Sequence, residues 1–237
     1  MDTGTGWVVN LFFDSEVGAV STVGSVESAY WVAELAEMRE EGVLDDTIVM
    51  FVSDHGDMLG NHRLWAKPPM HEWSAKIPMI LIPTAAYDRL GHHVTDDRLA
   101  ELRDVMPTLL DLCGIPIPDT VEGFSLASDE RRDHLYCEHG EDARAMRMIR
   151  ADQHKLIWYP VGNHLQLFDL ERDPQEMENV VDEPDYAEVR DRLRELLIDE
   201  LYGCDLEWVD GGKLVGLPAI EYEADKAGNP LIDRLVL

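Results

Sequence analysis

The sequence predicts an α/β fold, with part of a sheet and its flanking helices followed by a small α+β subdomain that contains an antiparallel hairpin. Two observations predict it. Apolar runs of strand length alternate with helical patterns as far as about residue 139, and two strand-like runs, a turn and a helix follow. The predicted organisation is an N-terminal segment at 1–25, an α/β part at 26–139, and the α+β subdomain with an irregular tail at 140–237.

The first elements are a strand, a helix and a strand. Trp7 to Phe13 is an apolar run of strand length. Residues 27–42 carry apolar side chains at helical spacing among acidic ones, and Gly42 marks the end of this predicted helix. The continuous apolar run from Ile48 to Val52 is typical of a strand that is covered on both faces.

A strand and a longer helix complete the α/β part. Ile77 to Ile82 is a second continuous apolar run, with a proline directly after it. Residues 97–113 carry leucines at helical spacing, which predicts a helix. Because proline cannot donate the helical hydrogen bond, Pro107 is expected to place a boundary or a kink inside that span.

The pattern changes after about residue 140. The strand-like runs 146–159 and 165–170 are joined by Pro160-Val161-Gly162-Asn163, which predicts a hairpin and therefore antiparallel sheet. Residues 184–202 form an amphipathic helical pattern. The tail from Gly203 is rich in glycine, proline and charge and is predicted to be irregular.

The composition excludes several classes of partner. The chain has 237 residues, with 48 acidic and 20 basic side chains and a net charge of −28. This balance argues against nucleic-acid binding and against docking on anionic lipid. No apolar run reaches the roughly 18–20 residues of a membrane span, and no signal peptide is visible, so a cytoplasmic protein is expected. Because the chain is rich in acids and has only five lysines, we expect adaptation to high salt; an ordinary acidic protein is the alternative.

The segment after the strand at 48–52 carries the candidate metal ligands. It reads Ser53-Asp54-His55-Gly56-Asp57-Met58-Leu59-Gly60. In open α/β sheets, functional sites lie just beyond the carboxyl ends of the strands. Asp54 offers a carboxylate oxygen and His55 an imidazole nitrogen, which together make half of a mixed site for a divalent cation. The alternative is a plain loop in which Asp54 caps the next turn and His55 is exposed.

A lysine twelve residues beyond His55 is the candidate for substrate contact. Lys67 lies between Trp65 and Pro68, in a chain that has few lysines. A lysine held near a metal ion directs a cation at a tetrahedral anion. His62, in the same segment, is a further candidate for substrate contact, and a polar loop histidine is the alternative.

These residues, and the order of the segments around them, resemble the sulfatase family of the alkaline-phosphatase-like superfamily. Residues 45–60 are similar to the second metal-ligand motif of that family. The similarity continues through 62–67, Glu72, 77–80, 104–112, 122–126, the hairpin at 147–159, and 166–174. The resemblance runs from about residue 27 to about residue 202, so it covers the C-terminal half of the family only, and segment 1–25 has no counterpart in it.

The resemblance implies a metal-dependent hydrolysis of sulfate esters, with a small-molecule sulfate or phosphate ester as substrate. It implies that Asp54 and His55 bind one divalent metal ion, with calcium as the first expectation and manganese or magnesium as alternatives. It implies that Lys67 contacts the sulfate oxygens and stabilises the charge that develops on them, while the metal acts as a Lewis acid.

The sequence departs from the family pattern in one respect. The family carries a formylglycine nucleophile, made from the first residue of a Cys/Ser-x-Pro-x-Arg stretch, and a pair of acidic ligands on an earlier strand. The 237 residues contain no such stretch. The chain is therefore expected to be incomplete as an isolated enzyme. The alternatives are a phosphate or phosphonate ester hydrolase of the same superfamily, or a non-catalytic fragment or partner module, in which a partner chain or a homo-oligomer supplies the other half.

Overall fold

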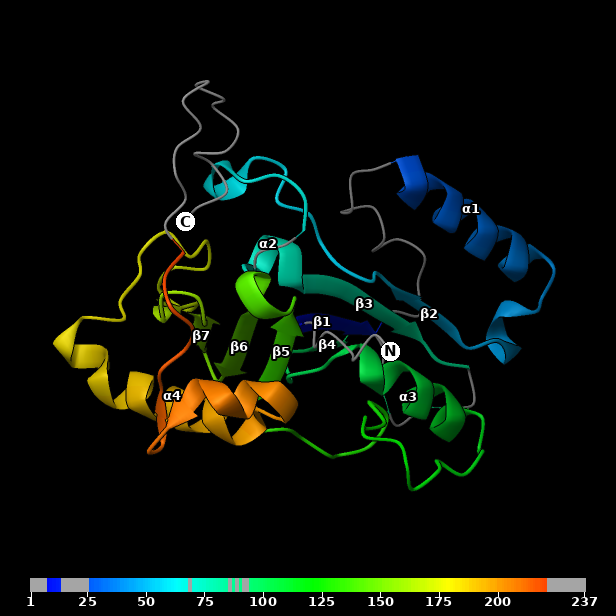
Figure 1. Ribbon diagram of the computed structural model, residues 1–237. Helices are drawn as coiled ribbons and strands as arrows, with labels where there is room; N and C mark the ends of the chain where they lie inside the picture. Colours follow the sequence, from blue (N-terminus) through cyan, green and yellow to red (C-terminus); the bar gives the residue numbers. More distant parts are fainter. Residues whose placement is uncertain are drawn as a thin grey trace.

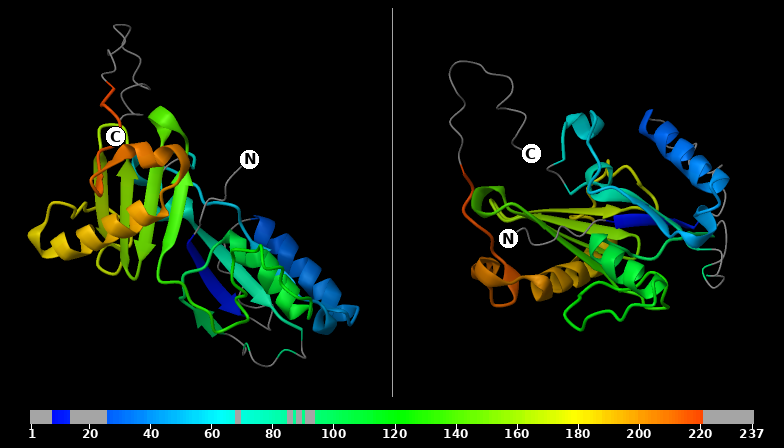
Figure 2. Two further views of the ribbon diagram at one scale, coloured as in Figure 1. Left: turned by 60° about the horizontal axis from the view of Figure 1, so that its bottom comes forward. Right: turned by 90° about the vertical axis from the view of Figure 1, so that its right-hand side faces the viewer.

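The computed structural model describes residues 8–13, 26–67, 70–84, 87, 90 and 94–220. These residues form two lobes, each built around a four-stranded sheet (Figures 1 and 2). Of these described residues, we call those up to 134 the α/β lobe and those from 135 to 220 the C-terminal lobe. The predicted fold class, α/β with an antiparallel C-terminal part, is confirmed.

The sheet of the α/β lobe is mixed. Its strands are β1 (Val8–Phe13), β2 (Val49–Val52), β3 (Lys76–Ile82) and β4 (Val94–Asp96), in the order β2-β3-β1-β4. β1 and β3 are parallel, whereas β2 and β4 run antiparallel to their neighbours. The three strands predicted in this part of the chain are therefore confirmed, and Trp7 lies outside the described residues.

The core of this lobe lies on β3. Its alternate residues Ile77, Met79 and Leu81 are at most 1% exposed, as expected for a strand with one face turned to a core. The four residues of β2 are only half-buried. The prediction that this run is covered on both faces is therefore wrong, because β2 is an edge strand that pairs with β3 alone among the described strands.

Helices flank this sheet on both sides. α1 (Val26–Glu40) lies on one side and α3 (Val105–Leu112) on the other (Figure 2). The predicted helix at 97–113 begins later, with a 3-10 turn, η5 (Leu102–Asp104), because Glu101 and Asp104 form a reciprocal capping box. The change from η5 to α3 comes three residues before Pro107, so the span contains the boundary expected there.

The C-terminal lobe contains an antiparallel meander. Its strands are β5 (Leu135–His139), β6 (Met146–Ala151), β7 (His154–Tyr159) and β8 (His164–Asp169). The predicted run 146–159 is two strands, because Asp152 has a left-handed φ of 51° and turns the chain back. The hairpin through 160–163 is confirmed as the link from β7 to β8. Since β5 pairs with β6, the sheet begins before the predicted boundary at residue 140.

One long helix covers this second sheet. η7 (Pro184–Tyr186) leads into α4 (Ala187–Glu200), which buries Leu193 and Leu197 against the core around Trp158. The chain continues as η8 (Gly203–Trp208) and a two-stranded ribbon, β9 (Val209–Asp210) and β10 (Lys213–Leu214). This part of the tail is therefore ordered rather than irregular, because the side chains of Trp208 and Leu214 are buried in the same core.

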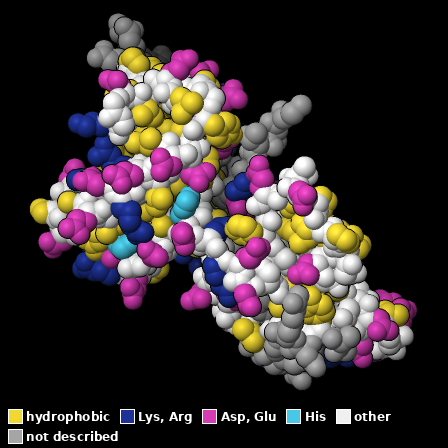
Figure 3. Space-filling model, turned by 90° about the horizontal axis from the view of Figure 1, so that it is seen from below, with side chains coloured by type: hydrophobic (Ala, Val, Ile, Leu, Met, Phe, Trp, Pro, Cys, Tyr) yellow, Lys and Arg dark blue, Asp and Glu magenta, His cyan; other side chains and the backbone are white. Residues whose placement is uncertain are grey.

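The two lobes meet around a short helix. α2 (Glu72–Ala75) directly precedes β3 and lies between the two sheets (Figure 1). Acidic side chains are spread over both lobes on the face shown in Figure 3. Among the described helices, none combines the length and the apolar character that crossing a bilayer requires.

Candidate functional site

The loop that leaves β2 is folded back on itself. The Ser53 hydroxyl donates a hydrogen bond to the carbonyl of His55 at 2.8 Å, and the His55 N–H donates to Asp54 Oδ1 at 2.9 Å. Asp54 therefore caps the turn with one oxygen, as the plain-loop alternative expected. His55 differs from that alternative, because its side chain is only 25% exposed whereas that of Asp54 is 79% exposed.

A backbone contact fixes the orientation and the tautomer of His55. Its Nδ1 lies 2.6 Å from the carbonyl oxygen of Gly56. A carbonyl only accepts hydrogen bonds, so Nδ1 carries the proton and the lone pair of the neutral ring lies on Nε2. His55 Nε2 lies 3.4 Å from Asp54 Oδ2, so the second oxygen of Asp54 and the lone pair of His55 face one another.

Lys67 joins this pair. Its Nζ lies 2.7 Å from His55 Nε2. The chain returns to His55 because the N–H of Met58 donates to the carbonyl of Ala66 at 3.1 Å, and the N–H of Gly60 to that of Leu64 at 2.9 Å. The Ser74 hydroxyl holds the backbone of Lys67 through a 2.7 Å hydrogen bond to its carbonyl. The structure therefore brings Asp54, His55 and Lys67 together at the exit of β2.

The two glycines of the loop, Gly56 and Gly60, have different structural roles. Gly60 has a φ of +99°, a conformation that favours glycine. Gly56 has a φ outside the left-handed region, but a Cβ there would lie 2.1 Å from the carbonyl oxygen of Trp73. Gly56 is thus needed for the close approach of the loop to α2, where its N–H donates to the carbonyl of Ser74 at 2.8 Å.

His62 lies elsewhere. Its Nε2 is 2.8 Å from the carbonyl of Gln175 in the C-terminal lobe, and its ring stacks on His71 with centroids 4.4 Å apart. These two contacts direct His62 toward Gln175 and His71. A role of His62 in substrate contact stays a prediction.

A buried charge cluster, which the sequence did not indicate, connects the two lobes. It consists of Glu72, Arg150, Lys155 and Glu176. Lys155 Nζ lies 2.7 Å from Glu176 Oε1, 2.6 Å from Glu72 Oε1 and 3.0 Å from the carbonyl of Met70, and its side chain is fully buried. Arg150 contacts the other oxygen of Glu72 at 3.2 Å.

The ionisation of the two carboxyl groups follows from these contacts. Burial raises the pKa of Glu176, but the Lys155 ammonium and the nearby His71 ring outweigh it, and the pKa falls to about 2. Burial likewise opposes ionisation of Glu72, and the charges of Lys155 and Arg150 hold its pKa below the usual value. Both carboxylates are therefore charged at neutral pH.

One sequence signal could have revealed this cluster. Glu176 lies in the acidic run 171–183, which would ordinarily be solvated, but its side chain is only 2% exposed. Lys155 lies in the run His154-Lys155-Leu156-Ile157-Trp158, whose apolar neighbours indicate a buried strand. A lysine at such a position requires a carboxylate partner, and the nearby acidic run could supply it.

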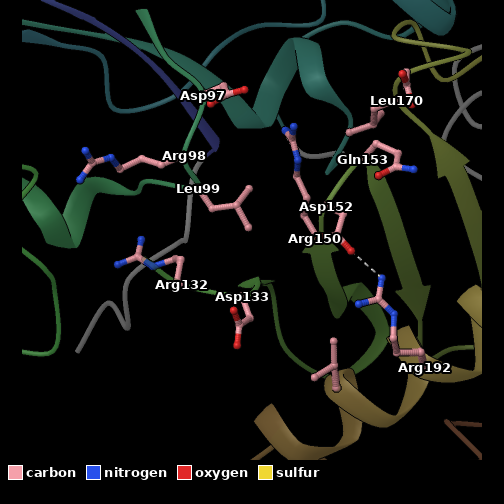
Figure 4. Close-up of a pocket in the computed structure, with 12 residues that line it drawn as sticks. Asp97, Arg98, Leu99, Arg132, Asp133, Arg150, Asp152, Gln153, Leu170 and Arg192 are labelled. Carbon is pink, nitrogen blue, oxygen red and sulfur yellow. Dashed lines mark hydrogen bonds and ion pairs between the residues drawn. The ribbon is translucent and has the colours of Figure 1, made fainter. Parts of the chain in front are cut away.

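A separate cavity of about 790 Å³ lies where the lobes meet (Figure 4). Its charged lining residues are Asp97, Arg98, Arg132, Asp133, Arg150, Asp152, Glu171 and Arg192. Arg192 is paired with Asp152 at 2.9 Å, and Arg132 forms a bidentate pair with the buried Asp104. None of the three residues at the exit of β2 lines this cavity. We therefore treat the exit of β2 as the candidate site, because an exposed aspartate, a histidine and an exposed lysine converge there, in the loop that directly follows a strand.

Two protein-family models match this chain. A family model described as N-sulphoglucosamine sulphohydrolase, C-terminal, matches residues 60–201, which is more than half of the chain. A second model, which covers a family described as a protein of unknown function, matches residues 13–95.

Curated relatives match over a part of their length. An arylsulfatase of Clostridium perfringens is 40% identical over 189 residues, which are 76% of this chain and 39% of the relative. A choline-sulfatase of Rhizobium meliloti is 35% identical over 163 residues, covering 65% of this chain and 31% of the relative. The chain thus spans less than two fifths of the length of these relatives.

A solved structure shares the arrangement of elements. The phosphonate monoester hydrolase of Agrobacterium radiobacter superposes with a TM-score of 0.62 and 27% identity, over 73% of this chain and 38% of that one. The match confirms the alkaline-phosphatase-like fold that the resemblance implied. Together with the family model, it shows that the chain belongs to the sulfatase family and corresponds to the C-terminal part of its members.

Proposed function

We propose that this chain forms the metal- and lysine-bearing part of a hydrolase that cleaves small-molecule sulfate esters. The observation that carries the proposal is the position of His55 Nε2, which faces both Asp54 Oδ2 at 3.4 Å and Lys67 Nζ at 2.7 Å. The sulfatase relatives favour sulfate over other esters.

The residues at the exit of β2 fit a divalent cation. Ligands about 2.1–2.4 Å from one metal ion and at right angles to one another lie roughly 3.0–3.4 Å apart, which agrees with the 3.4 Å between Asp54 Oδ2 and His55 Nε2. The bond from His55 Nδ1 to the Gly56 carbonyl is the outer contact that ligating histidines typically make. The Lys67 ammonium lies 2.7 Å from Nε2, so this nitrogen already faces a positive charge, which supports the proposal. Calcium, manganese and magnesium all suit a site that includes carboxylate oxygen.

Lys67 would bind the substrate. Its side chain is exposed, and its backbone is held by Ser74. An ammonium group beside a metal ion attracts the non-bridging oxygens of a sulfate and stabilises the charge that grows on them in the transition state. When bound, the metal ion would act as a Lewis acid on one of those oxygens.

A second candidate substrate class is supported by the solved structure. The phosphonate monoester hydrolase of Agrobacterium radiobacter shares the fold at 27% identity. Phosphonate and sulfate esters both present tetrahedral anionic oxygens, and Lys67 would contact either group. Comparing rates on matched sulfate and phosphonate esters separates the two.

The residues of this chain supply part of a catalytic centre. Asp54 and His55 give two ligands, whereas calcium takes six to eight oxygen-type ligands and magnesium six. The 237 residues hold no Cys/Ser-x-Pro-x-Arg stretch from which a formylglycine nucleophile could be made. We therefore propose that full turnover requires a nucleophile and further ligands from another polypeptide segment.

Metal binding and hydrolysis test the proposal separately. Calorimetric titration with Ca²⁺ or Mn²⁺ should show one site that Asp54→Ala removes and that Asp45→Ala, an exposed control carboxylate, retains. Hydrolysis of p-nitrophenyl sulfate, however slow, should disappear with EDTA and with Lys67→Ala but persist in the exposed control Lys213→Ala. Metal-dependent hydrolysis that survives both Asp54→Ala and Lys67→Ala would refute the site.

A further inference from the structure

Two histidines and a glutamate meet where the Lys67 segment touches the C-terminal lobe. They are His62 from the 3-10 turn η3 (Asn61–Arg63), His71 directly before α2, and Glu176 after β8. One ligand atom from each lies within 4.8 Å of the other two. None of the three belongs to the group at the exit of β2.

The His71 ring has a buried nitrogen, Nδ1, that faces this cluster. His71 is 5% exposed, and its Nδ1 makes no hydrogen bond with any described residue. This nitrogen lies 3.3 Å from Glu176 Oε2. Burying a nitrogen that makes no hydrogen bond costs free energy of folding. A metal ion bound to that nitrogen would remove the cost.

The distance between these two atoms matches that between ligands of a tetrahedral metal ion. Ligand atoms about 2 Å from a tetrahedral zinc ion lie about 3.3 Å apart. His71 Nδ1 and Glu176 Oε2 are already at this separation. His62 is half-buried and is the most movable of the three, so it can close the wider gap.

The partners of His62 and Glu176 suit metal ligands. His62 Nε2 lies against the carbonyl of Gln175 at 2.8 Å, so it carries the proton, and the lone pair of the neutral ring lies on Nδ1. Glu176 Oε1 is paired with Lys155, while Oε2 accepts the N–H of Glu72 at 2.6 Å and still faces His71. Such outer contacts orient metal ligands in known sites.

We propose that His62, His71 and Glu176 bind one transition-metal ion of the Zn²⁺ class, with water as the fourth ligand. Two imidazoles and a carboxylate suit zinc, nickel or copper rather than calcium or magnesium, which prefer oxygen. The ion joins the segment that carries Lys67 to the C-terminal lobe, so its role is structural. The proposal does not depend on the hydrolase function.

A competing arrangement is a plain ion pair between a protonated His71 and Glu176, with no metal. It would satisfy the same 3.3 Å distance and would keep the Lys155 ammonium away from a second cation. The two arrangements predict different responses to zinc, so metal binding distinguishes them directly.

Calorimetric titration of the full 237-residue chain with Zn²⁺, in excess Ca²⁺, tests the proposal. We expect one zinc equivalent to bind in the wild-type chain and in Asp54→Ala. His62→Gln and His71→Gln should weaken binding at least tenfold, whereas His164→Gln, which alters an exposed histidine, should leave it unchanged. Co²⁺ in place of zinc should give visible absorption bands typical of tetrahedral nitrogen ligation.

Stability provides a second readout. Zinc should raise the unfolding temperature of the wild-type chain and not that of His62→Gln, because only binding to the folded state stabilises it. If the buried His71→Gln does not fold, the half-buried His62→Gln decides the matter. Absence of zinc binding in the wild-type chain, equal affinity in His62→Gln, or loss of binding in Asp54→Ala would each overturn the proposal.

Discussion

Lys67 Nζ lies 2.7 Å from His55 Nε2, although twelve residues separate the two in the chain. Because His55 Nδ1 donates its proton to the Gly56 carbonyl, the lone pair of the ring lies on Nε2, and the ammonium group of Lys67 faces that lone pair. When a histidine ligates a metal ion, this lone pair coordinates the ion. Lys67 and a bound metal ion therefore compete for the same nitrogen, unless an anionic substrate draws the lysine away.

This competition predicts opposite effects of one substitution. Lys67→Met should strengthen binding of Mn²⁺ or Ca²⁺ about tenfold, because a like charge beside the metal is removed, which is worth about 1.4 kcal/mol. The same variant should weaken binding of sulfate to the metal-loaded chain. Calorimetry with metal alone and then with sulfate measures both effects. Equal metal affinity in Lys67→Met and in the control Lys213→Met would contradict the competition.

The buried charge cluster predicts a large effect on stability. Lys155→Met leaves the carboxylates of Glu72 and Glu176 buried without their ammonium partner, and removing one member of such a cluster costs about 3–5 kcal/mol. Urea unfolding should show this loss, whereas Lys213→Met, at an exposed position, should leave the free energy of unfolding nearly unchanged.

A double variant tests whether the loss comes from the pair itself. Lys155→Met combined with Glu176→Gln should be less destabilised than the sum of the two single variants, because the second substitution removes an unpaired charge. Additive losses would show that the two side chains act independently.

The ion pair of Asp96 with Arg98 predicts a pH dependence. Burial raises the pKa of Asp96, but hydrogen bonds and the charge of Arg98 outweigh it, so the folded pKa lies below the ordinary 3.8. A carboxyl with a depressed folded pKa stabilises the protein above its unfolded pKa, and that contribution is lost as pH falls through the folded value. Acid unfolding curves should therefore show less pH dependence below about pH 4 in Asp96→Asn than in the wild type. Asp45→Asn, at an exposed position, should retain the wild-type curve.

The net charge of −28 predicts a dependence on salt. Cations at molar KCl screen the repulsion among the exposed carboxylates, since the Debye length falls to about 3 Å. We propose that the chain is adapted to such conditions and expect its unfolding temperature to rise steadily with KCl. An unfolding temperature that does not change between low and molar KCl would contradict this proposal.

The local parts of the fold could be predicted from the sequence, and the long-range parts could not. The strand at 48–52 and the Asp54–His55 pair directly after it follow from neighbouring residues, and the structure places Lys67 beside them. The edge position of β2 depends on which strand pairs with it, which periodicity does not encode. The turn inside the run 146–159 could not be recognised from the sequence pattern, because only Asp152 and Gln153 separate the two strands.

The burial of Glu176 shows the same limit for charged groups. An acidic run is normally solvated, and burial of this carboxylate becomes favourable through partners far away in the sequence, chiefly Lys155 on a strand 21 residues earlier. The position of His62 against Gln175 likewise depends on the packing of one lobe on the other. Such contacts between segments far apart in sequence require the fold before they can be recognised.

We propose above all that His55 ligates a divalent cation together with Asp54. Pulsed electron paramagnetic resonance on the chain loaded with one equivalent of Mn²⁺ tests it most directly, because an imidazole nitrogen bound to the ion modulates the spin echo. We predict nitrogen modulation in the wild-type chain and in His62→Gln and His164→Gln, and its loss in His55→Gln. Mn²⁺ that shows no nitrogen modulation, or modulation that persists in His55→Gln, would contradict the account.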